Sequence, residues 1–237
     1  MPNDAKLTLI EHLDELRIRI IKSIVVLILF FVLTFFYVES ILGVLIRPVG
    51  RLVFIAPQEA FIANIKVAFF GGLFISIPYI LFQVWQFISV ALTEKESRLL
   101  NMLGPLSILF FYLGALFCYF VIVPIGLRFL LSFSSDVVRP AISISKYISF
   151  VGSLTFVFGI IFELPLVTLF LTKIGIINPY MLQKGRRYAI VLIFILAAIL
   201  TPPDVVTQCL MALPLIVLYE IGIIFSKLSV KKDVPKE

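Results

Sequence analysis

The amino-acid sequence predicts an all-α integral membrane protein with six transmembrane helices, forming a single membrane domain over residues 1–237. Composition is the first observation behind this prediction: the chain is 61% hydrophobic and 14% charged, whereas roughly 25% of the residues in a soluble domain are charged. The second observation is that long charge-free stretches recur along the chain. A spanning helix needs about 20 predominantly apolar residues, so these stretches leave little chain for anything but membrane spans.

Six apolar stretches give the expected spans. They are residues 23–38, 67–93, 99–127, 147–173, 188–203 and 205–226, the fourth interrupted only by Glu163 and the last only by Glu220. The third stretch would be about 43 Å long as a helix, which exceeds a hydrocarbon core of about 30 Å, so it must tilt, kink or protrude. The fifth would be only about 24 Å long. Either it borrows from its flanks or the bilayer thins around it, and we expect short fifth and sixth spans.

Prolines predict kinks within these spans. Pro78, Pro105, Pro124, Pro165 and Pro214 all lie inside apolar runs. Each of them removes one helix hydrogen bond, because proline has no backbone N–H. Pro165 is of particular interest, since it frees the carbonyl of Ile161 next to Glu163.

The distribution of basic residues predicts the topology. If the spans alternate, 14 of the 20 lysines and arginines lie on the side of the two termini and 6 on the other side. Both termini are therefore expected in the cytoplasm. Residues 7–22 have apolar side chains at helical spacing, which predicts an amphipathic helix that lies at the inner surface and then turns into the first span. Residues 228–237 are polar and are expected to form a disordered tail.

The residues needed for catalysis are scarce. The single histidine, His12, lies in the amphipathic segment, so no Ser/His dyad, bis-histidine haem or HExxH zinc site can form within the spans. We therefore expect no catalytic residue, no metal and no cofactor. Cys118 and Cys209 lie inside spans and are interpreted as packing thiols. The net charge of +6 is attributed to topology rather than to nucleic-acid binding.

Glu163 is the most unusual residue of the predicted spans. An acidic side chain at membrane depth costs about 2.5–3.5 kcal/mol on insertion scales, so it needs a polar partner or a water-filled cavity. One interpretation is a protonated carboxyl group that bonds a neighbouring helix. Another is a concave polar surface that meets a substrate or a partner helix. The residue also suggests an alternative function, a proton- or ion-coupled small-molecule transporter. Such transporters often contain internal repeats, and we find none in this sequence.

Carboxylates also gather at the expected inner rim of the membrane. Glu15 and Arg19 have the i,i+4 spacing of a helical ion pair, and Thr93 with Glu96 fits a capping box. These local roles do not exclude a second one, because both glutamates would lie at the inner ends of adjacent spans and could receive one cationic ligand together. Asp204 is most simply the N-cap of the last span.

Four motifs together resemble one family. They are "HLDELRIRI" (12–20), "PYILFQVWQFI" (78–88), "FGIIFELP" (158–165) and "LTPPDVVTQ" (200–208). Their order and spacing, over residues 7–228, resemble the TatC family, the multi-spanning receptor subunits of the twin-arginine protein translocase. Two departures from the family pattern affect the inner rim: Val90 stands in "ISVAL" where the family commonly has proline, and Ser97 interrupts the basic run that usually follows the loop glutamate.

The resemblance implies a function without catalysis. TatC-like proteins bind the signal peptides of folded proteins at the cytoplasmic face, where paired arginines are recognised, and pass the cargo across the cell inner membrane using the proton-motive force. They work with small single-span partners, TatB-like and TatA-like, and self-associate in a receptor complex within the lipid bilayer. The resemblance also implies a concave arrangement of kinked helices.

The family motifs assign roles to ten residues. The signal-peptide site would comprise Glu15, Glu96, Arg17, Arg19 and Phe87. Glu163 would be the acid of the concave face, with Asp204 and Gln208 near the edge where partners dock, while Pro48 would shape the external cap and Pro165 would be structural. Guanidinium presents a planar fork to a carboxylate, and each charge-assisted hydrogen bond contributes about 1.5–3 kcal/mol, so two arginines can be distinguished from two lysines.

Overall fold

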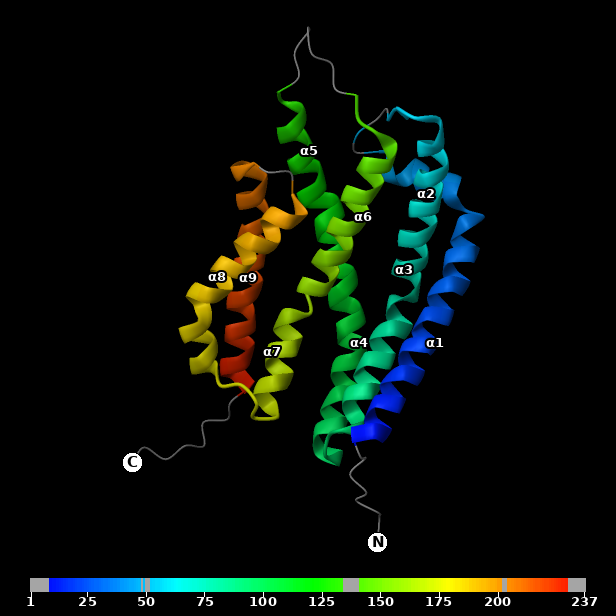
Figure 1. The fold of residues 1–237 in the computed structure, drawn as a ribbon. Helices are drawn as coiled ribbons and strands as arrows, with labels where there is room; N and C mark the ends of the chain where they lie inside the picture. Colours follow the sequence, from blue (N-terminus) through cyan, green and yellow to red (C-terminus); the bar gives the residue numbers. More distant parts are fainter. Residues whose placement is uncertain (1–8, 48, 50–51, 134–140, 202–203, 230–237) are drawn as a thin grey trace. The chain divides into compact units, whose positions relative to one another are not determined.

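The computed structural model of the chain describes residues 9–47, 49, 52–133, 141–201 and 204–229 (Figure 1). This part of the chain is helical apart from short connections and one isolated bridge between Val53 and Ser143. The elements are α1 (Leu9–Phe35), α2 (Val38–Leu45), α3 (Pro57–Val90), α4 (Glu94–Phe117), the π-helical turn η1 (Cys118–Ile122), α5 (Val123–Leu131), α6 (Ile144–Ile161), α7 (Leu164–Lys173), α8 (Pro179–Leu200) and α9 (Val205–Ser229). The predicted all-α class is confirmed.

Five helical stretches of the described chain are long and apolar enough to cross a membrane. They are Ile10–Phe35, Pro57–Val90, Glu94–Leu131, Ile144–Lys173 and Val205–Ser229. The protein is therefore a multi-pass membrane protein. The remaining predicted span corresponds to α8, which has 22 residues but includes Lys184, Arg186 and Arg187 in its first half. The count of six spans stays a prediction for this helix.

Three predicted boundaries were wrong. Residues 9–22 do not form a separate surface helix that turns into the first span, because α1 runs unbroken for 27 residues and contains neither proline nor glycine. The sixth span is not short, since α9 has 25 residues. That helix also includes 228 and 229, which were assigned to the disordered tail. The rest of that tail, 230–237, lies outside the described residues, as does Pro48.

Helix α8, the predicted fifth span, is longer than its short apolar run. Helix α8 begins at Pro179, with the Asn178 side chain accepting a hydrogen bond from the Tyr180 N–H, and it ends at Leu200. The first turns of the helix therefore consist of residues from the polar flank that precedes the apolar run. Its 22 residues make it about 33 Å long at 1.5 Å per residue.

The prolines act in two ways. Pro78, Pro105 and Pro214 lie within continuous helices, whereas Pro165 lies in the first turn of α7, directly after a break at Phe162 and Glu163. At this break the Glu163 N–H bonds the Ile160 carbonyl at 3.0 Å, an i to i−3 bond that tightens the end of α6. The predicted kink at Pro165 is therefore a complete interruption of the helix.

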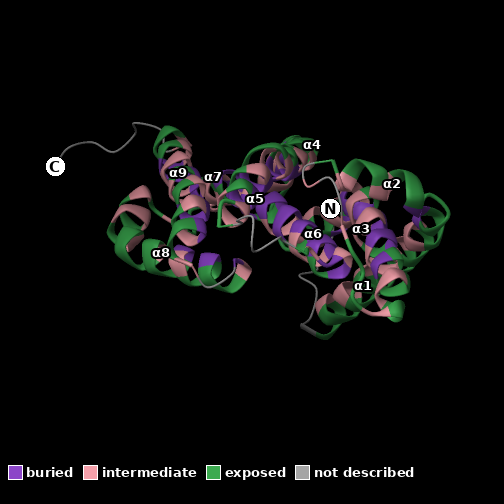
Figure 2. Ribbon diagram, turned by 90° about the horizontal axis from the view of Figure 1, so that it is seen from above, coloured by how far each residue is buried: buried purple, intermediate pink, exposed green. Residues whose placement is uncertain are grey.

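The described chain divides into two compact units. The first comprises Met1–Ile108 and Ala141–Gly152, and the second comprises Leu109–Pro140 and Ser153–Glu237. The boundary falls within α4 and within α6. Figure 2 shows that α1 and α8 are mostly exposed, whereas buried positions are frequent in α6. An apolar side chain exposed on a spanning helix faces lipid, so this exposure carries no cost in a membrane.

In the first unit, α1 packs along α3 at very short range. Gly72 makes this possible: a Cβ atom on it would lie 2.6 Å from the backbone nitrogen of Phe31. Gly71 likewise leaves room for Thr34, whose Cγ2 would lie 2.4 Å from such a Cβ. Small residues let helix backbones approach closely in membranes, where van der Waals packing replaces the hydrophobic effect as the driving force. The contact fixes the register between α1 and α3.

In the second unit, α7 packs on α9 through a seam of small and hydroxyl residues. The Thr168 hydroxyl lies 3.3 Å from the Gly222 carbonyl oxygen, and the hydroxyl oxygens of Thr172 and Ser226 lie 2.7 Å apart. The Thr172 hydroxyl donates to the carbonyl of Thr168 at 2.7 Å, which leaves its oxygen to accept from the Ser226 hydroxyl. Neutral hydroxyl groups of this kind join helices in apolar surroundings.

Candidate functional site

The N-terminal part of α1 and the C-terminal part of α3 carry a polar cluster centred on the guanidinium of Arg19. Its Nε and Nη2 donate to Oε1 of Glu15 at 3.0 and 2.5 Å. Its Nη1 donates to the side-chain oxygens of Gln83 at 2.9 Å and Gln86 at 2.7 Å. We call these four residues the Arg19 cluster. The predicted ion pair between Glu15 and Arg19 is confirmed, and α3 supplies two further acceptors.

Burial makes this cluster more than a surface ion pair. The Arg19 side chain is 13% exposed and that of Glu15 is 22% exposed, while Gln83 is 6% exposed. Hydrogen bonds to charged groups strengthen as water is withdrawn from them. The spacing of Gln83 and Gln86, three residues apart on α3, places both amides on the face turned toward α1.

Phe87 closes the same end of the α1–α3 pair. Its ring stacks on His12, with centroids 4.4 Å apart and the planes 20° from parallel. The contact joins the first turns of α1 to the last turn of α3. Phe87 was predicted as a site residue and lies beside the Arg19 cluster, but its stacking on His12 was not foreseen.

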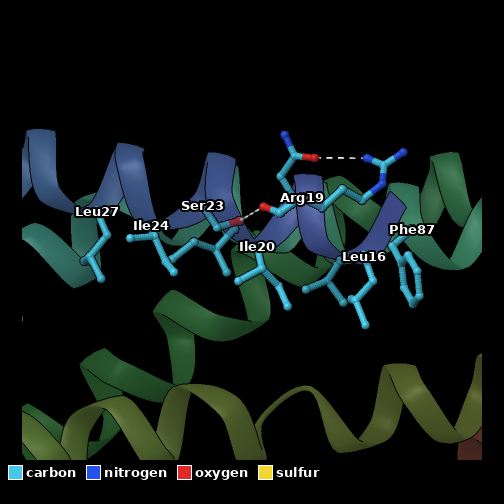
Figure 3. Close-up of a pocket in the computed structure, with 10 residues that line it drawn as sticks. Leu16, Arg19, Ile20, Ser23, Ile24, Leu27 and Phe87 are labelled. Atoms are coloured by element: carbon cyan, nitrogen blue, oxygen red, sulfur yellow. Dashed lines mark hydrogen bonds between the residues drawn. The ribbon is translucent and has the colours of Figure 1, made fainter. Parts of the chain in front are cut away.

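An apolar groove leads away from the Arg19 cluster between α1 and α3 (Figure 3). It has a volume of about 400 Å³, and its lining includes both Arg19 and Phe87. Figure 3 shows Leu16, Ile20 and Ile24 projecting from α1 to one side. The polar cluster therefore adjoins apolar walls.

The other predicted residues of the inner rim have separate positions. The Glu96 carboxylate accepts from the backbone N–H of Thr93 at 2.9 Å and from its hydroxyl at 2.7 Å, which confirms the capping box at the start of α4. This turn follows the end of α3 after only three residues, so it lies at the same end of the first unit as the Arg19 cluster (Figure 1). Arg17 is exposed on α1.

The predicted residues of the second unit differ in their surroundings. Glu163 is 8% exposed, at the break between α6 and α7. The Asp204 carboxylate accepts from the Thr207 backbone N–H at 2.7 Å and from the Thr207 hydroxyl, so its predicted role as N-cap of α9 is confirmed. Gln208 donates from Nε2 to the carbonyl of Phe194 in α8 at 3.0 Å.

The hydrogen bonds of Asp204 lower its pKa. The bond from the Thr207 hydroxyl, followed by that from the Thr207 backbone N–H, holds the pKa of Asp204 below its ordinary value. Asp204 lies before the first residue of α9, outside the apolar helix. Its carboxylate is therefore charged at neutral pH and interacts favourably with the positive N-terminal end of the α9 dipole.

Sequence reasoning missed several polar residues. Gln83 and Gln86 stand out in hindsight, as two amides three residues apart in an otherwise apolar run. Arg186 of α8 pairs with Glu220 of α9 at 2.7 Å, with side chains 46% and 40% exposed. An exposed pair between two helices has no spacing signal in the sequence.

A second missed group joins the start of α3 to the segment that leads into α6 in the first unit. The Glu59 carboxylate accepts from the Ser143 hydroxyl and from the backbone N–H groups of Ile55 at 2.7 Å and Ser145 at 3.3 Å. Lys66 donates to the Ser145 hydroxyl at 2.7 Å. The backbone pairs as well, since Val53 donates to Ile142 at 3.0 Å. This group is structural and needs no ligand to account for it.

Fold and site together define a class: a multi-pass helical membrane protein that collects charged and amide side chains at one end of a helix pair. Comparisons place the chain within this class. Residues 11–214 match the family model described as Sec-independent protein translocase protein (TatC). The TatC of Carboxydothermus hydrogenoformans is 40% identical over 235 residues, 97% of both chains. The TatC of Aquifex aeolicus is 41% identical over 232 residues, 94% of this chain and 96% of that one.

A solved structure agrees with these relatives. The crystal structure of the twin-arginine translocase receptor TatC superposes with a TM-score of 0.85 at 41% identity, covering 92% of this chain and 99% of that one. The chain belongs to the TatC family and is a receptor subunit of the Sec-independent, twin-arginine protein translocase. Membership of a protein-translocase family disfavours the alternative of a small-molecule transporter built around Glu163.

Proposed function

We propose that the protein binds the twin-arginine signal peptides of folded proteins at its cytoplasmic face through Glu15 and Glu96, with Arg17, Arg19 and Phe87 in the same region. One observation carries the proposal: the Glu15 carboxylate already holds a guanidinium, that of Arg19, at 3.0 and 2.5 Å. A side chain placed to accept one guanidinium has the geometry to accept another. Glu96 would meet the second arginine of the pair.

Arginine suits this arrangement better than lysine for a physical reason. A guanidinium presents N–H groups from three nitrogens in one plane, whereas an ammonium presents three from a single atom. The carboxylate at Glu15 bonds two of those nitrogens at once. A lysine in the same place would lose the second bond.

Transport would use the second unit. We propose that Glu163, Asp204 and Gln208 form the region where TatA-like and TatB-like single-span partners dock, and that the assembly uses the proton-motive force to move cargo. The burial of Glu163 supports this role, because an acid retained at depth is a functional candidate by default.

The protein would reside in the cell inner membrane with both termini in the cytoplasm, as the excess of basic residues indicates. We propose no enzymatic activity.

Peptide binding tests the proposed receptor site. The purified protein in lipid nanodiscs should bind a signal peptide with Arg-Arg more tightly than the same peptide with Lys-Lys. Glu15→Ala and Glu96→Ala should each weaken Arg-Arg binding about tenfold or more, since each removes charge-assisted hydrogen bonds. Glu94→Ala is the matched control, an exposed glutamate on the same turn of α4. Unchanged Arg-Arg binding in both glutamate variants would show that these residues are not the receptor site.

A further inference from the structure

We infer that Arg19 occupies, in the unliganded receptor, the same guanidinium site that an arginine of the signal peptide takes, and that Gln83 and Gln86 complete this site. This inference depends on the proposed function, because it assigns the substrate contacts of that receptor site. Signal-peptide binding is then an exchange, in which one guanidinium replaces another. Gln83 and Gln86 become residues that determine specificity.

The arrangement of acceptors matches a guanidinium as a whole. Glu15 receives bonds from Nε and Nη2, on one edge of the Arg19 guanidinium. Gln83 and Gln86 both receive from Nη1, at the other end of the plane. All three nitrogens are therefore engaged. An ammonium at any one point could reach only part of this set, so the cluster as built distinguishes arginine from lysine.

Burial explains why the site is filled before any peptide arrives. The Gln83 side chain is only 6% exposed, and the guanidinium supplies a hydrogen bond to its oxygen at 2.9 Å. A buried acceptor without a donor is unfavourable. An internal arginine satisfies the acceptors until an equivalent group replaces it, and the exchange conserves both the charge and the number of hydrogen bonds in the site.

The exchange also has a route. Arg19 lines the groove between α1 and α3, and Figure 3 shows it one turn from Ser23, whose hydroxyl donates to the Arg19 carbonyl at 2.9 Å. This bond anchors the backbone and leaves the guanidinium held only by the cluster. The site is competent for a peptide only when Arg19 has left it, so the apparent affinity is the intrinsic affinity multiplied by the fraction of time that Arg19 is out of the site.

Removing the resident arginine provides the main test. Arg19→Gln keeps an amide that can donate to Gln83 and Gln86, and it should tighten binding of the Arg-Arg peptide to full-length protein in nanodiscs about tenfold, because the competitor is gone. Lys22→Gln is the control: it removes the same charge from an exposed position three residues further along α1 and should leave affinity unchanged. Unchanged or weaker binding by Arg19→Gln would overturn the inference.

A second test addresses the two glutamines. Gln83→Leu and Gln86→Leu should each weaken Arg-Arg binding severalfold and leave Lys-Lys binding unchanged, so that the ratio of the two affinities falls. Small cations test the vacated site directly: methylguanidinium should displace the peptide from Arg19→Gln at a lower concentration than methylammonium. Equal displacement by the two cations would mean that the cluster recognises charge alone and would contradict the inference.

Different results would contradict the proposed function and the exchange of guanidinium groups. If the unmodified protein binds Arg-Arg and Lys-Lys peptides equally, the proposed function is wrong. If it prefers Arg-Arg, and Arg19→Gln binds no more tightly than the unmodified protein, only the exchange is wrong.

Discussion

The α1–α3 contact and the α7–α9 contact solve the same packing problem with different polar groups. Both bring helices together through glycine, at Gly72 in the first and Gly222 in the second. In the first contact the polar side chains gather toward one end of the helix pair, where the charged groups of Glu15 and Arg19 meet the neutral amide of Gln83. In the second they are neutral hydroxyls that bond to each other and to backbone carbonyls along the seam.

This difference in polar groups distinguishes a contact suited to recognition from one that only packs helices together. A neutral hydroxyl that bonds another side chain or a backbone carbonyl between two packed helices holds those helices together. A guanidinium held by acceptors beside a groove can be replaced there by another guanidinium. The hydroxyl seam therefore serves cohesion, whereas the Arg19 cluster is suited to binding.

The largest effect is expected from closing the space at Gly72. Gly72→Ala would bring a methyl group against the Phe31 backbone, which cannot move away as a side chain can. We expect destabilisation of about 1–3 kcal/mol, measured as loss of thermal stability in detergent, together with loss of peptide binding because the Arg19 cluster spans this contact. Gly43→Ala is the control, because a Cβ there meets nothing within 4 Å. Equal stability of both variants would mean that α1 and α3 do not need this close approach.

Glu163 is an acid in the same unit as the neutral α7–α9 seam. Glu163→Gln should preserve folding and signal-peptide binding but reduce export of folded cargo about tenfold, because an acid retained at membrane depth is expected to be functional. The measurement is export in cells together with co-purification of the small partners. Normal export by Glu163→Leu would reduce the residue to a structural one.

The hydroxyl seam should affect stability without affecting binding. Thr172→Val removes the hydroxyl that pairs with Ser226, at an expected cost of about 0.6–1.7 kcal/mol. The double variant Thr172→Val with Ser226→Ala should lose less than the sum of the single variants, because the two side chains share one bond. Peptide affinity should stay constant throughout. A change in peptide affinity would show that the α7–α9 contact does more than hold the two helices together.

The smallest effect is a dependence on pH at Asp204. Because its pKa in the folded protein is lowered, its contribution to stability is present above 3.8, the ordinary pKa of aspartate, and is lost as the pH falls through the lowered value. Asp204→Asn should therefore be less stable to heat than the unmodified protein at pH 7. Near pH 3 the two thermal stabilities should lie closer together. Thermal unfolding at both pH values measures this. A difference that stays constant across the range would exclude the carboxylate as its source.

Local patterns in the sequence predicted local structure well. The Glu15–Arg19 pair, the Thr93–Glu96 capping box and the Asp204 cap each depend on residues three or four apart, where helix geometry alone sets the distance. The break at Pro165 is likewise a property of one residue, although its completeness depends on the packing of α6 and α7.

Contacts between distant segments could not be predicted in this way. The bonds from Arg19 to Gln83 and Gln86 depend on the register of α1 against α3, which the close approach at Gly72 determines. The bond from Gln208 to the Phe194 carbonyl and the pair between Arg186 and Glu220 depend in the same way on the packing of α8 against α9. Apolar composition indicated that helices would pack together but contained no information about register.

The discontinuity of the first unit has a consequence for biosynthesis. Glu59 and Lys66 find their partners Ser143 and Ser145 at sequence separations of 84 and 79 residues, with the start of the second unit encoded in between. A nascent chain that has emerged only as far as Ile108 therefore contains the whole Arg19 cluster but lacks Ser143 and Ser145, which bond the first turns of α3. During insertion into the membrane, α3 therefore lacks these hydrogen-bond partners until the segment up to Gly152 has been translated.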